Sequence, residues 1–408
     1  MDRTREADAG RLVAAVVARA EAVHRAKVPH YHTLMRFFNL DLHQSVIEDV
    51  RDIFRRLYGD TVEITHWSIS AHNWVFGKPD RDVQHINQDT WTDFTHDRIR
   101  LFQETYHEEL SSYDGFIVCH TPVFALLYEK YAKPIIIVNS CRYDQPFCWT
   151  KDVEMAQELH ACLARLRQAG LLYVVSNNTG DQHYLYTKAG IPSTHIPSLC
   201  LYVNAVYEPK KKEFVIFTGN RSHIFPSHPL LVQKPGPGYT WKELYEYRGL
   251  VHSPYEMSTM SIFEQYWAGV PQFFPTRRFY KELVEEGKME CISMYESWGE
   301  YFTERQMDAW LDHADWLTFP GLYYYDSFDD LLRQLEGFDD VHSDMRWRYI
   351  SATKERVLEQ WKTLLAPLIP GRKKDSQRTV NTMKSISKSS SPHGGRILPL
   401  LEGSWDRG

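Results

Sequence analysis

Glu256 and Glu264, which have seven residues between them, are the side chains whose surroundings most clearly predict a chemical role. The sequence between them predicts a helix that begins at about Ser258, soon after an apolar strand. The exposed N–H groups near Ser258, Thr259 and Met260 would bind an anion such as phosphate. Glu264 lies about two turns further along, where its carboxylate can accept hydrogen bonds from two neighbouring hydroxyl groups. Together these features predict a site for a nucleoside diphosphate.

Polar residues follow the other predicted strands as well. Ligands of open parallel sheets bind beyond the carboxyl ends of the strands, so the joint placement of these residues matters more than any one of them. In the first half of the chain they are Asp41, His43, His72, Asn73, Trp74, His120, Thr121, Asn139, Arg142, Tyr143, Asp144, Asn177 and Asn178. In the second half they are Gly219, Asn220, Arg221, Ser253, Tyr255 and Glu256. Such groups suit hydroxyl and phosphate ligands, and we expect them to face a cleft between two domains.

The stretch 256–271 resembles the signature of the retaining GT-B glycosyltransferases. In that family a Ser-Pro or Pro-Ser strand end precedes a Glu, seven residues, a second Glu and an Ala-Gly-Val-Pro segment. Here Ser253 and Pro254 form the strand end, and residues 268–271 read Ala-Gly-Val-Pro. The resemblance implies that Glu264 holds the ribose hydroxyls of a nucleotide sugar and that Glu256 lies near the donor sugar.

The family also places Arg and Lys after the first strand of its second domain, where they neutralise the diphosphate. Arg221 matches the Arg, but no Lys follows within several residues. Lys234 is distant in the sequence, and His223 or Arg277 could substitute for the missing Lys. The segment 257–259 replaces the glycine-rich loop that the family usually has after the first Glu, and the first-domain glycine-rich turn is also absent.

Two stereochemical outcomes compete. A His, or a His and an Asp, after the first strand resembles the general base of inverting GT-B enzymes, which must deprotonate the acceptor hydroxyl directly. Asp41 and His43 stand at that place. We expect retention, because the spacing of Glu256 and Glu264 belongs to a whole strand–loop–helix–strand segment, whereas one His in a polar loop is common.

The expected roles divide the site residues into three groups. The catalytic residues are Glu256, His43 and Asp41. The donor-binding residues are Gly219, Asn220, Arg221, Ser258, Thr259, Met260 and Glu264, and the acceptor-binding residues are Trp74, Arg142 and Asp144. Arg221 and the helix N-terminus would stabilise the leaving diphosphate electrostatically.

The elements that must position these residues alternate between short apolar strands and helices, a pattern typical of parallel α/β units. The expected fold is two Rossmann-like doubly wound α/β domains facing a cleft, with a C-terminal closing helix and a disordered tail, as in GT-B proteins. The expected parts are an N-terminal helix (1–27), an acceptor domain (28–207), a nucleotide-sugar domain (208–342), the closing helix (343–370) and a basic, Ser-rich tail (371–408).

Individual elements follow from the same periodicity. Strands are expected at 32–40, 61–70, 114–120, 133–140, 171–178, 191–202, 213–219, 248–254 and 270–275. Helices are expected at 45–58, 94–110, 122–131, 155–170, 240–247, 258–269, 279–287 and 342–367. Thr240 and Glu243 have the spacing of a capping box.

Composition limits the functional classes. Of 408 residues, 43% are hydrophobic and 25% charged, as in soluble globular proteins, and the net charge of −6 provides no global field for nucleic acid. Six cysteines without a Cys-x-x-Cys pair fit neither a disulfide scaffold nor a zinc ribbon, which favours reduced thiols and a cytoplasmic location. There is no phosphate-binding P-loop, no His-Glu-x-x-His, and no Asp-x-Asp at a strand end. We therefore expect no metal and no cofactor.

The expected substrates are a nucleotide sugar and a hydroxyl acceptor, such as a glycan, glycoprotein or lipid. No transmembrane segment is evident, but the amphipathic stretch at 12–17 leaves a peripheral contact with a membrane surface open. The expected function is sugar transfer from a nucleoside diphosphate to a hydroxyl acceptor, retaining and metal-independent. A nucleotide-sugar epimerase of GT-B type, or a non-catalytic protein that binds glycans or nucleotides, remains an alternative.

Overall fold

The computed structural model describes residues 34–70, 82–120, 122–217, 222–234, 239–290, 292, 298 and 304–369. By its contacts, this part of the chain belongs to one compact unit that ends at Ile369. The N-terminal helix expected at 1–27 and the tail expected at 371–408 lie outside the described residues.

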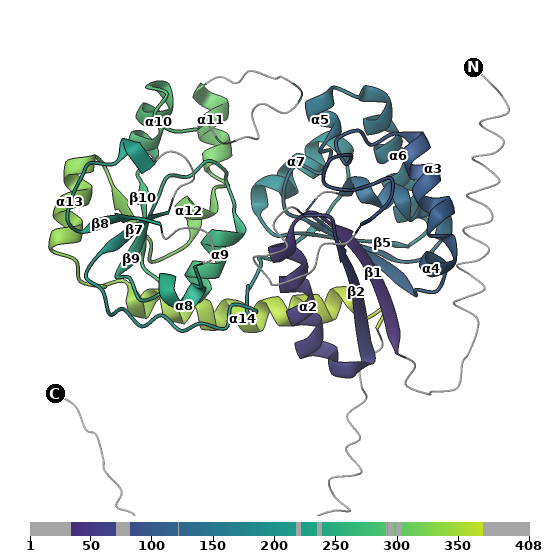
Figure 1. Cartoon of the computed structure of the whole chain (residues 1–408), viewed down its shortest axis with the longest axis horizontal. Helices are drawn as coiled ribbons and strands as arrows, with labels where there is room; N and C mark the ends of the chain where they lie inside the picture. The colour runs from purple at the N-terminus through teal and green to yellow at the C-terminus, as the bar shows by residue number, and fades with distance from the viewer. Residues whose placement is uncertain are drawn as a thin grey trace, which may run out of the picture. The chain divides into compact units, whose positions relative to one another are not determined.

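The first half of the chain forms a parallel sheet of six strands in the order β2-β1-β3-β4-β5-β6 (Figure 1). The strands are β1 (Met35–Asp41), β2 (Val62–Ser68), β3 (Gly115–His120), β4 (Ile135–Asn139), β5 (Leu172–Ser176) and β6 (Thr194–His195). The helices are α2 (Gln44–Tyr58), α3 (His96–Thr105), α4 (His107–Ser111), α5 (Phe147–Thr150), α6 (Val153–Gln168) and α7 (Thr179–Ala189), with 3₁₀ turns at Gly59–Thr61, Pro122–Leu127 and Glu129–Tyr131.

The second half forms a parallel sheet of five strands in the order β8-β7-β9-β10-β11. The strands are β7 (Phe214–Phe217), β8 (Leu231–Gln233), β9 (Gly249–His252), β10 (Gln272–Pro275) and β11 (Tyr323–Tyr325). The helices are α8 (Trp241–Leu244), α9 (Met260–Trp267), α10 (Arg277–Glu285), α11 (Glu304–Leu311), α12 (Asp315–Thr318) and α13 (Phe328–Glu336), with a 3₁₀ turn at Ser222–Ile224.

The chain passes through the strands of the two sheets in the same order. In each, the chain begins in an inner strand, steps to one side, returns past its start and continues in the opposite direction. The strand order therefore reverses between β1 and β3 in the first sheet and between β7 and β9 in the second. In open α/β sheets ligands bind at this switch point. The loops after these four strands are therefore the expected ligand-binding loops.

A glycine occupies the same position next to the switch point in both sheets. Gly115 opens β3 and pairs with Phe37 of β1, while Gly249 opens β9 and pairs with Phe214 of β7. A Cβ atom on Gly115 would lie 2.7 Å from the Phe37 ring, and one on Gly249 would lie 3.0 Å from the Phe214 ring. Each would also lie within 3.0 Å of the carbonyl oxygen of a proline that precedes the next strand. Only glycine fits this close approach of backbone and ring.

The strands are apolar because both faces of each sheet are covered. Along β7, Phe214 and Ile216 pack into the main core cluster, whereas Val215 packs into a smaller cluster on the other face. Leu250 and Val251 of β9 divide between the same two clusters. Burial on both faces explains why these strands read as continuous apolar runs rather than as alternating patterns.

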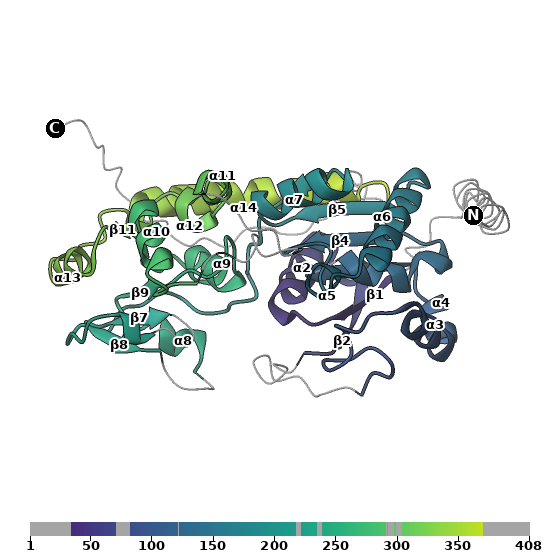
Figure 2. The same ribbon diagram turned by 90° about the horizontal axis from the view of Figure 1, so that it is seen from above.

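The long helix α14 (Ser343–Leu365) contacts both halves of the chain (Figures 1 and 2). Near its start, Arg346 donates to the carbonyl oxygens of Gly321 and Gly269 in the second half. Near its end, the Trp361 ring lies edge-on to Phe54 of α2, with 5.8 Å between ring centroids. The closing helix expected from the sequence therefore packs against both halves of the chain.

The predicted fold class, two parallel α/β domains with a closing helix, is confirmed. Thr240 and Glu243 form the expected capping box at α8. The helices α5, α7, α11, α12 and α13 and the strands β8 and β11 were not expected from the sequence. Of these, α7 shows little apolar periodicity, and β8 and β11 have three residues each. The stretch 122–131 forms 3₁₀ turns rather than one helix. The five described cysteines are buried free thiols, and none of the described helices is long and apolar enough to cross a membrane.

Candidate functional site

The inner strands of the first sheet end in polar residues at one edge. Asp41 ends β1, His120 ends β3, Asn139 ends β4 and Ser176 ends β5. Parallel pairing keeps these ends level, since Asn139 pairs with His120 on one side and with Ser176 on the other. The fold therefore brings together these strand-end groups.

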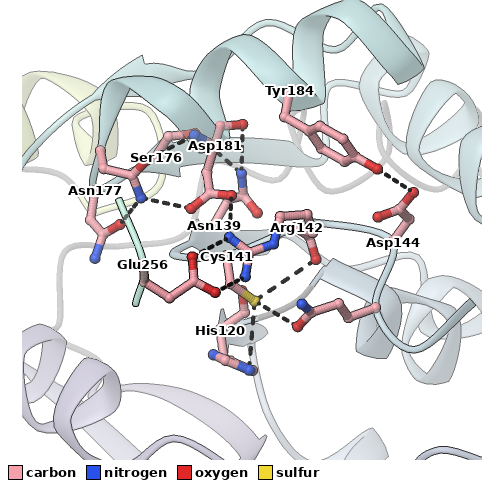
Figure 3. A network of polar contacts seen from close by, with 12 residues as sticks. His120, Asn139, Cys141, Arg142, Asp144, Ser176, Asn177, Asp181, Tyr184 and Glu256 are labelled. Carbon is pink, nitrogen blue, oxygen red and sulfur yellow. Dashed lines mark hydrogen bonds and ion pairs between the residues drawn. The ribbon is translucent and has the colours of Figure 1, made fainter. Parts of the chain in front are cut away.

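Arg142, in the loop after β4, connects this edge to the second sheet (Figure 3). Its two terminal nitrogens donate to both carboxylate oxygens of Glu256, at 2.6 and 3.1 Å. The two side chains are only 7% and 15% exposed, so water screens the pair weakly. Asp181 of α7 adds a second negative charge 3.8 Å from the guanidinium. Burial would lower the pKa of Arg142, but the charges of Glu256 and Asp181 raise it, and the guanidinium stays protonated.

Asp181 is itself fixed by its neighbours. Asn178, the N-cap residue of α7, accepts a hydrogen bond from the Asp181 N–H and donates one to its carboxylate, both at 2.7 Å. Asn139 donates to the Asp181 carbonyl oxygen at 3.2 Å. Burial raises the pKa of Asp181 to about 6, although Arg142 and Asn178 oppose the rise. Arg142 thus lies between two acidic groups from different domains.

Asp41 contacts the backbone of the two strands at the switch point. Its carboxylate accepts hydrogen bonds from the N–H groups of His43 and Cys119, at 2.8 and 2.9 Å. Burial raises the pKa of Asp41 to about 7, while these N–H groups act to lower it. The contacts fasten the loop after β1 to the end of β3. Through the backbone, Asp41 therefore orients the segment that carries His43.

The His43 imidazole is partly exposed and stacks on His120, with 5.1 Å between ring centroids and 29° between ring planes. Burial lowers the pKa of His120 well below its usual value, and the charges of His43 and Arg142 act in the same direction. His120 has φ of +57°, a left-handed conformation that is uncommon for a residue with a Cβ atom. The sequence analysis mentioned His120 only as a strand-end residue, and the stacking shows that it belongs beside His43.

Asp144 is covered in this structure. The residue is 1% exposed and accepts hydrogen bonds from the Tyr184 hydroxyl at 3.1 Å and from the Trp298 indole at 2.7 Å. Figure 3 shows Tyr184 directed at this carboxylate. Burial raises the pKa of Asp144, and these two donors oppose the rise. Because Trp298 belongs to the second half of the chain, Asp144 provides a further contact between the two halves.

Glu264 lies on α9 at a junction of the two halves. Its carboxylate accepts hydrogen bonds from the Tyr202 hydroxyl and, at 3.3 Å, from the Trp241 indole. Burial raises the pKa of Glu264, and hydrogen bonds from Tyr202, Trp241 and Ser45 partly offset this. Since each carboxylate oxygen can accept more than one hydrogen bond, these contacts orient Glu264 and leave acceptor capacity for a ligand.

The helix α9 begins at Met260, with Thr259 as its N-cap residue, two residues later than expected. The Met260 sulfur lies 3.8 Å from the Asn177 side chain of the first domain. Ser258 is hydrogen-bonded to the side chain of Asp315, whose pKa is raised to about 8 by burial. At neutral pH a protonated Asp315 therefore adds no fixed negative charge against an anion at this helix N-terminus.

Lys234 is near Glu264 in space although distant from the first strand in sequence. It directly follows β8, which pairs with β7, and its ammonium group lies 4.8 Å from the ring centroids of Phe217 and Tyr239. The charge of Glu264 raises the pKa of Lys234 against the larger, lowering effect of burial. Arg277, one of the two residues expected to substitute for the missing Lys, is paired with Asp312 at 2.5 Å.

Seven residues named from the sequence lie outside the described residues: Trp74, Gly219, Asn220 and Arg221 of the expected site, and the strand-end residues His72, Asn73 and Thr121. Within the part of the chain that the structure describes, no group of three or more His, Cys, Asp or Glu side chains is placed to hold a metal ion.

Comparisons with known proteins give similarity at the level of fold only. No protein-family model and no curated relative matches the sequence. Among solved structures, the glycotransferase of kitacinnamycin is 10% identical, with a TM-score of 0.43 over 81% of this chain and 98% of that one. The glycosyltransferase SnogD from Streptomyces nogalater is 11% identical, with a TM-score of 0.43 over 82% and 99% of the two chains.

A third structure, MnaA of S. aureus with UDP, is 10% identical, with a TM-score of 0.38 over 69% of this chain and 91% of that one. All three TM-scores lie below 0.5 and identity is near one tenth, so these similarities concern the fold alone.

Proposed function

We propose that the chain is a glycosyltransferase that moves a sugar from a nucleoside diphosphate sugar to a hydroxyl group of a glycan, glycoprotein or lipid. The observation that carries the proposal is the contact between Arg142 and Glu256. It joins the carboxyl edge of the first sheet to that of the second, so two substrates held by the two edges would meet there. Holding two reactants in register is the main task of a transferase.

The donor is assigned to the second domain. A carboxylate oriented by two donors, Glu264, suits the two hydroxyls of a ribose. The N-terminus of α9 and the Lys234 ammonium group supply positive potential for a diphosphate. Positive groups held in advance at the leaving diphosphate stabilise the charge that develops there as the sugar departs.

The acceptor is assigned to the first domain. The partly exposed imidazole of His43 can form a hydrogen bond with an acceptor hydroxyl group, and the stacked His120 ring limits its orientations. Arg142 is held in place by Glu256 and Asp181, so its side chain would form a rigid wall of the acceptor site. In this proposal Asp41 is a positioning residue, because its carboxylate contacts the His43 backbone.

The finer features of the proposal are retention of the anomeric configuration, activity without a divalent metal, and transfer of a hexosyl or pentosyl group. Retention rests on Glu256 beside the donor sugar. Independence of metal rests on cationic side chains and the helix N-terminus taking the role that a metal ion has elsewhere.

The test is a screen of purified full-length chain against nucleoside diphosphate sugars that differ in base and sugar. Melting temperature identifies the donor, since a ligand that binds the folded state raises it. The selected donor is then incubated with hydroxyl acceptors, with and without excess chelator, and release of the nucleoside diphosphate is measured. We expect transfer in both conditions. Glu246→Gln, at a partly exposed glutamate paired with Lys210, serves as the control variant.

The alternatives give different outcomes in the same screen. Conversion of the donor to its epimer without transfer would identify an epimerase. Thermal stabilisation by nucleotide without turnover on any acceptor would identify a binding protein. If no nucleotide sugar raises the melting temperature or turns over, the proposal is wrong. Loss of transfer in chelator, restored by magnesium or manganese, would overturn metal independence alone.

A further inference from the structure

A cavity of about 750 Å³ lies among α7, α12 and α14. Its lining residues are not among those assigned to donor or acceptor, although one of them, Asp315, contacts Ser258 of the donor site. Figure 2 shows these three helices along the same side of the ribbon. The cavity volume falls within the range of about 300–1,000 Å³ that encloses whole small molecules. The space is therefore larger than a single tetrahedral anion requires.

Positive and donor groups line this cavity from different elements. They are Arg356 of α14, His195 at the end of β6, His183 of α7, and His313 in the loop before α12. Arg356 is exposed and close enough to His195 to lower the pKa of that imidazole, together with the larger effect of burial. One His195 nitrogen is hydrogen-bonded to the Asn177 backbone, so the guanidinium is the first group to pair with an anion. A bound dianion would favour protonation of His195, whose second nitrogen could then donate to it.

The lining also contains an acidic residue, Asp315. Its side chain is 4% exposed, and its Oδ2 atom has no hydrogen-bond partner within the described residues. Burial raises its pKa to about 8, which makes the carboxyl group a hydrogen-bond donor at neutral pH. A buried polar atom without a partner costs free energy unless a ligand or water satisfies it.

The other acidic residue of the lining does not cancel the positive charge. Asp312 forms an ion pair with Arg277 at 2.5 Å. With Asp312 paired to Arg277, Arg356 provides a positive charge at the exposed end of the cavity. The rest of the lining includes amide and hydroxyl side chains, among them those of Gln182 and Thr318.

We propose that this cavity binds a small phosphomonoester with a hydroxylated carbon skeleton, with the phosphate at Arg356 and His195 and a hydroxyl group at Asp315. The phosphate would make charge-assisted hydrogen bonds at the exposed end. The skeleton would fill the remaining volume and satisfy the carboxyl group of Asp315 at the buried end. The site does not depend on the proposed sugar transfer.

Asp315 also gives the cavity a route to the candidate active site. Its N–H group donates to the carbonyl oxygen of Met257, the residue after Glu256, at 2.9 Å, and its side chain is hydrogen-bonded to Ser258. A ligand that orders Asp315 would therefore act on the loop that carries Glu256. The proposal concerns binding, and this link is a consequence of where the cavity lies.

The test is calorimetric titration of the full-length chain with glycerol 3-phosphate, ribose 5-phosphate and a hexose monophosphate. Inorganic phosphate and free ribose are the reference ligands. We expect at least one ester to bind, with ribose silent and inorganic phosphate weaker than the ester. Arg356→Ala should weaken ester binding at least tenfold, whereas Arg348→Ala, an exposed arginine of the same helix outside the cavity, should change it less than twofold.

Three results would overturn the proposal. The first is the absence of binding for all three esters. The second is an equal loss in the Arg356→Ala and Arg348→Ala variants, which would show non-specific attraction to α14. The third is binding that survives Arg356→Ala but disappears in Glu264→Ala, which would place the ester in the proposed donor site. If inorganic phosphate binds as tightly as the esters, the assignment of a hydroxylated skeleton is wrong.

Discussion

The guanidinium of Arg142 and the carboxylate of Glu256, 114 residues apart in the sequence, form a two-bond ion pair that joins the two sheets. Both side chains are largely buried, so neither charge can be solvated if its partner is removed. The sequence analysis assigned the two residues to different substrates. Because the two residues are in contact, we expect a substitution at one of them to alter the position of the other.

The first prediction concerns the energetics of this pair. Arg142→Met should destabilise the fold by about 3–5 kcal/mol, because it leaves the buried carboxylates of Glu256 and Asp181 without their cation. Glu256→Gln should cost less, because Asp181 still lies 3.8 Å from the guanidinium. The double variant should lose less than the sum of the two, as expected for contacting residues. Denaturant unfolding of the four proteins measures the coupling. A matched cycle at the exposed pair Arg278 and Glu282 should give less than about 1 kcal/mol, and strict additivity at Arg142 and Glu256 would contradict the prediction.

The second prediction concerns Glu264. Glu264→Gln should lower the affinity for the nucleoside diphosphate about ten- to hundredfold, since loss of a charged hydrogen-bond partner costs about 1.5–3 kcal/mol. Tyr202→Phe should have a smaller effect, because it removes only a contact that orients the carboxylate. Calorimetry provides the affinities, and Glu246→Gln should leave them unchanged. An unaltered affinity in Glu264→Gln would remove this residue from the donor site.

The third prediction concerns stereochemistry. Proton NMR of the first-formed product from a donor of known anomer should show retention. His43→Ala should keep measurable turnover, whereas Glu256→Gln should lose it. The stability of Glu256→Gln must be measured in parallel, because the same substitution breaks the pair with Arg142. An inverted product together with an inactive His43→Ala variant would instead make His43 the general base.

The fourth prediction follows from the raised pKa of Asp315, about 8 in the folded chain against 3.8 for the ordinary carboxyl group. The folded state therefore binds this proton more tightly than the unfolded state. The resulting stability is complete below about pH 4 and is lost as pH rises towards 8. Relative to Asp315→Asn, the wild type should lose up to about 1.4 kcal/mol per pH unit within this window.

Unfolding at pH 5, 6.5 and 8 checks this dependence. The exposed Asp339→Asn variant is the control, and its stability should follow the wild type across the series. Parallel curves for the wild type and Asp315→Asn would show that Asp315 does not hold its proton in the folded state.

The fifth prediction uses the repeated glycine at the two switch points. Gly115→Ala and Gly249→Ala should each destabilise the fold by about 1–3 kcal/mol, because the added methyl group meets a phenylalanine ring and a carbonyl oxygen. At Gly337 the new Cβ would make an ordinary 3.6 Å contact, so Gly337→Ala should be neutral or stabilising by up to about 1 kcal/mol. Thermal unfolding compares the three. Equal effects at all three positions would refute the steric explanation.

Much of the fold could be predicted because the signals are local. Runs such as 135–138 are apolar over their whole length, which is typical of strands covered on both faces. The capping box at Thr240 and Glu243 is set by side chains three residues apart. The helix α7 was missed because its residues show little apolar periodicity, and its start depends on Asn178 bonding Asp181.

Some features of the candidate site could likewise be predicted from the sequence, whereas others depend on the tertiary structure. The sequence by itself determined the α/β alternation and which polar residues follow the strands, because strand ends and helix starts depend on neighbouring residues. Only the tertiary structure decided the strand order, the pairing of Arg142 with Glu256 and the nearness of Lys234 to Glu264. These relationships join residues far apart in the chain, and they arise from the packing of whole sheets and helices rather than from local propensity.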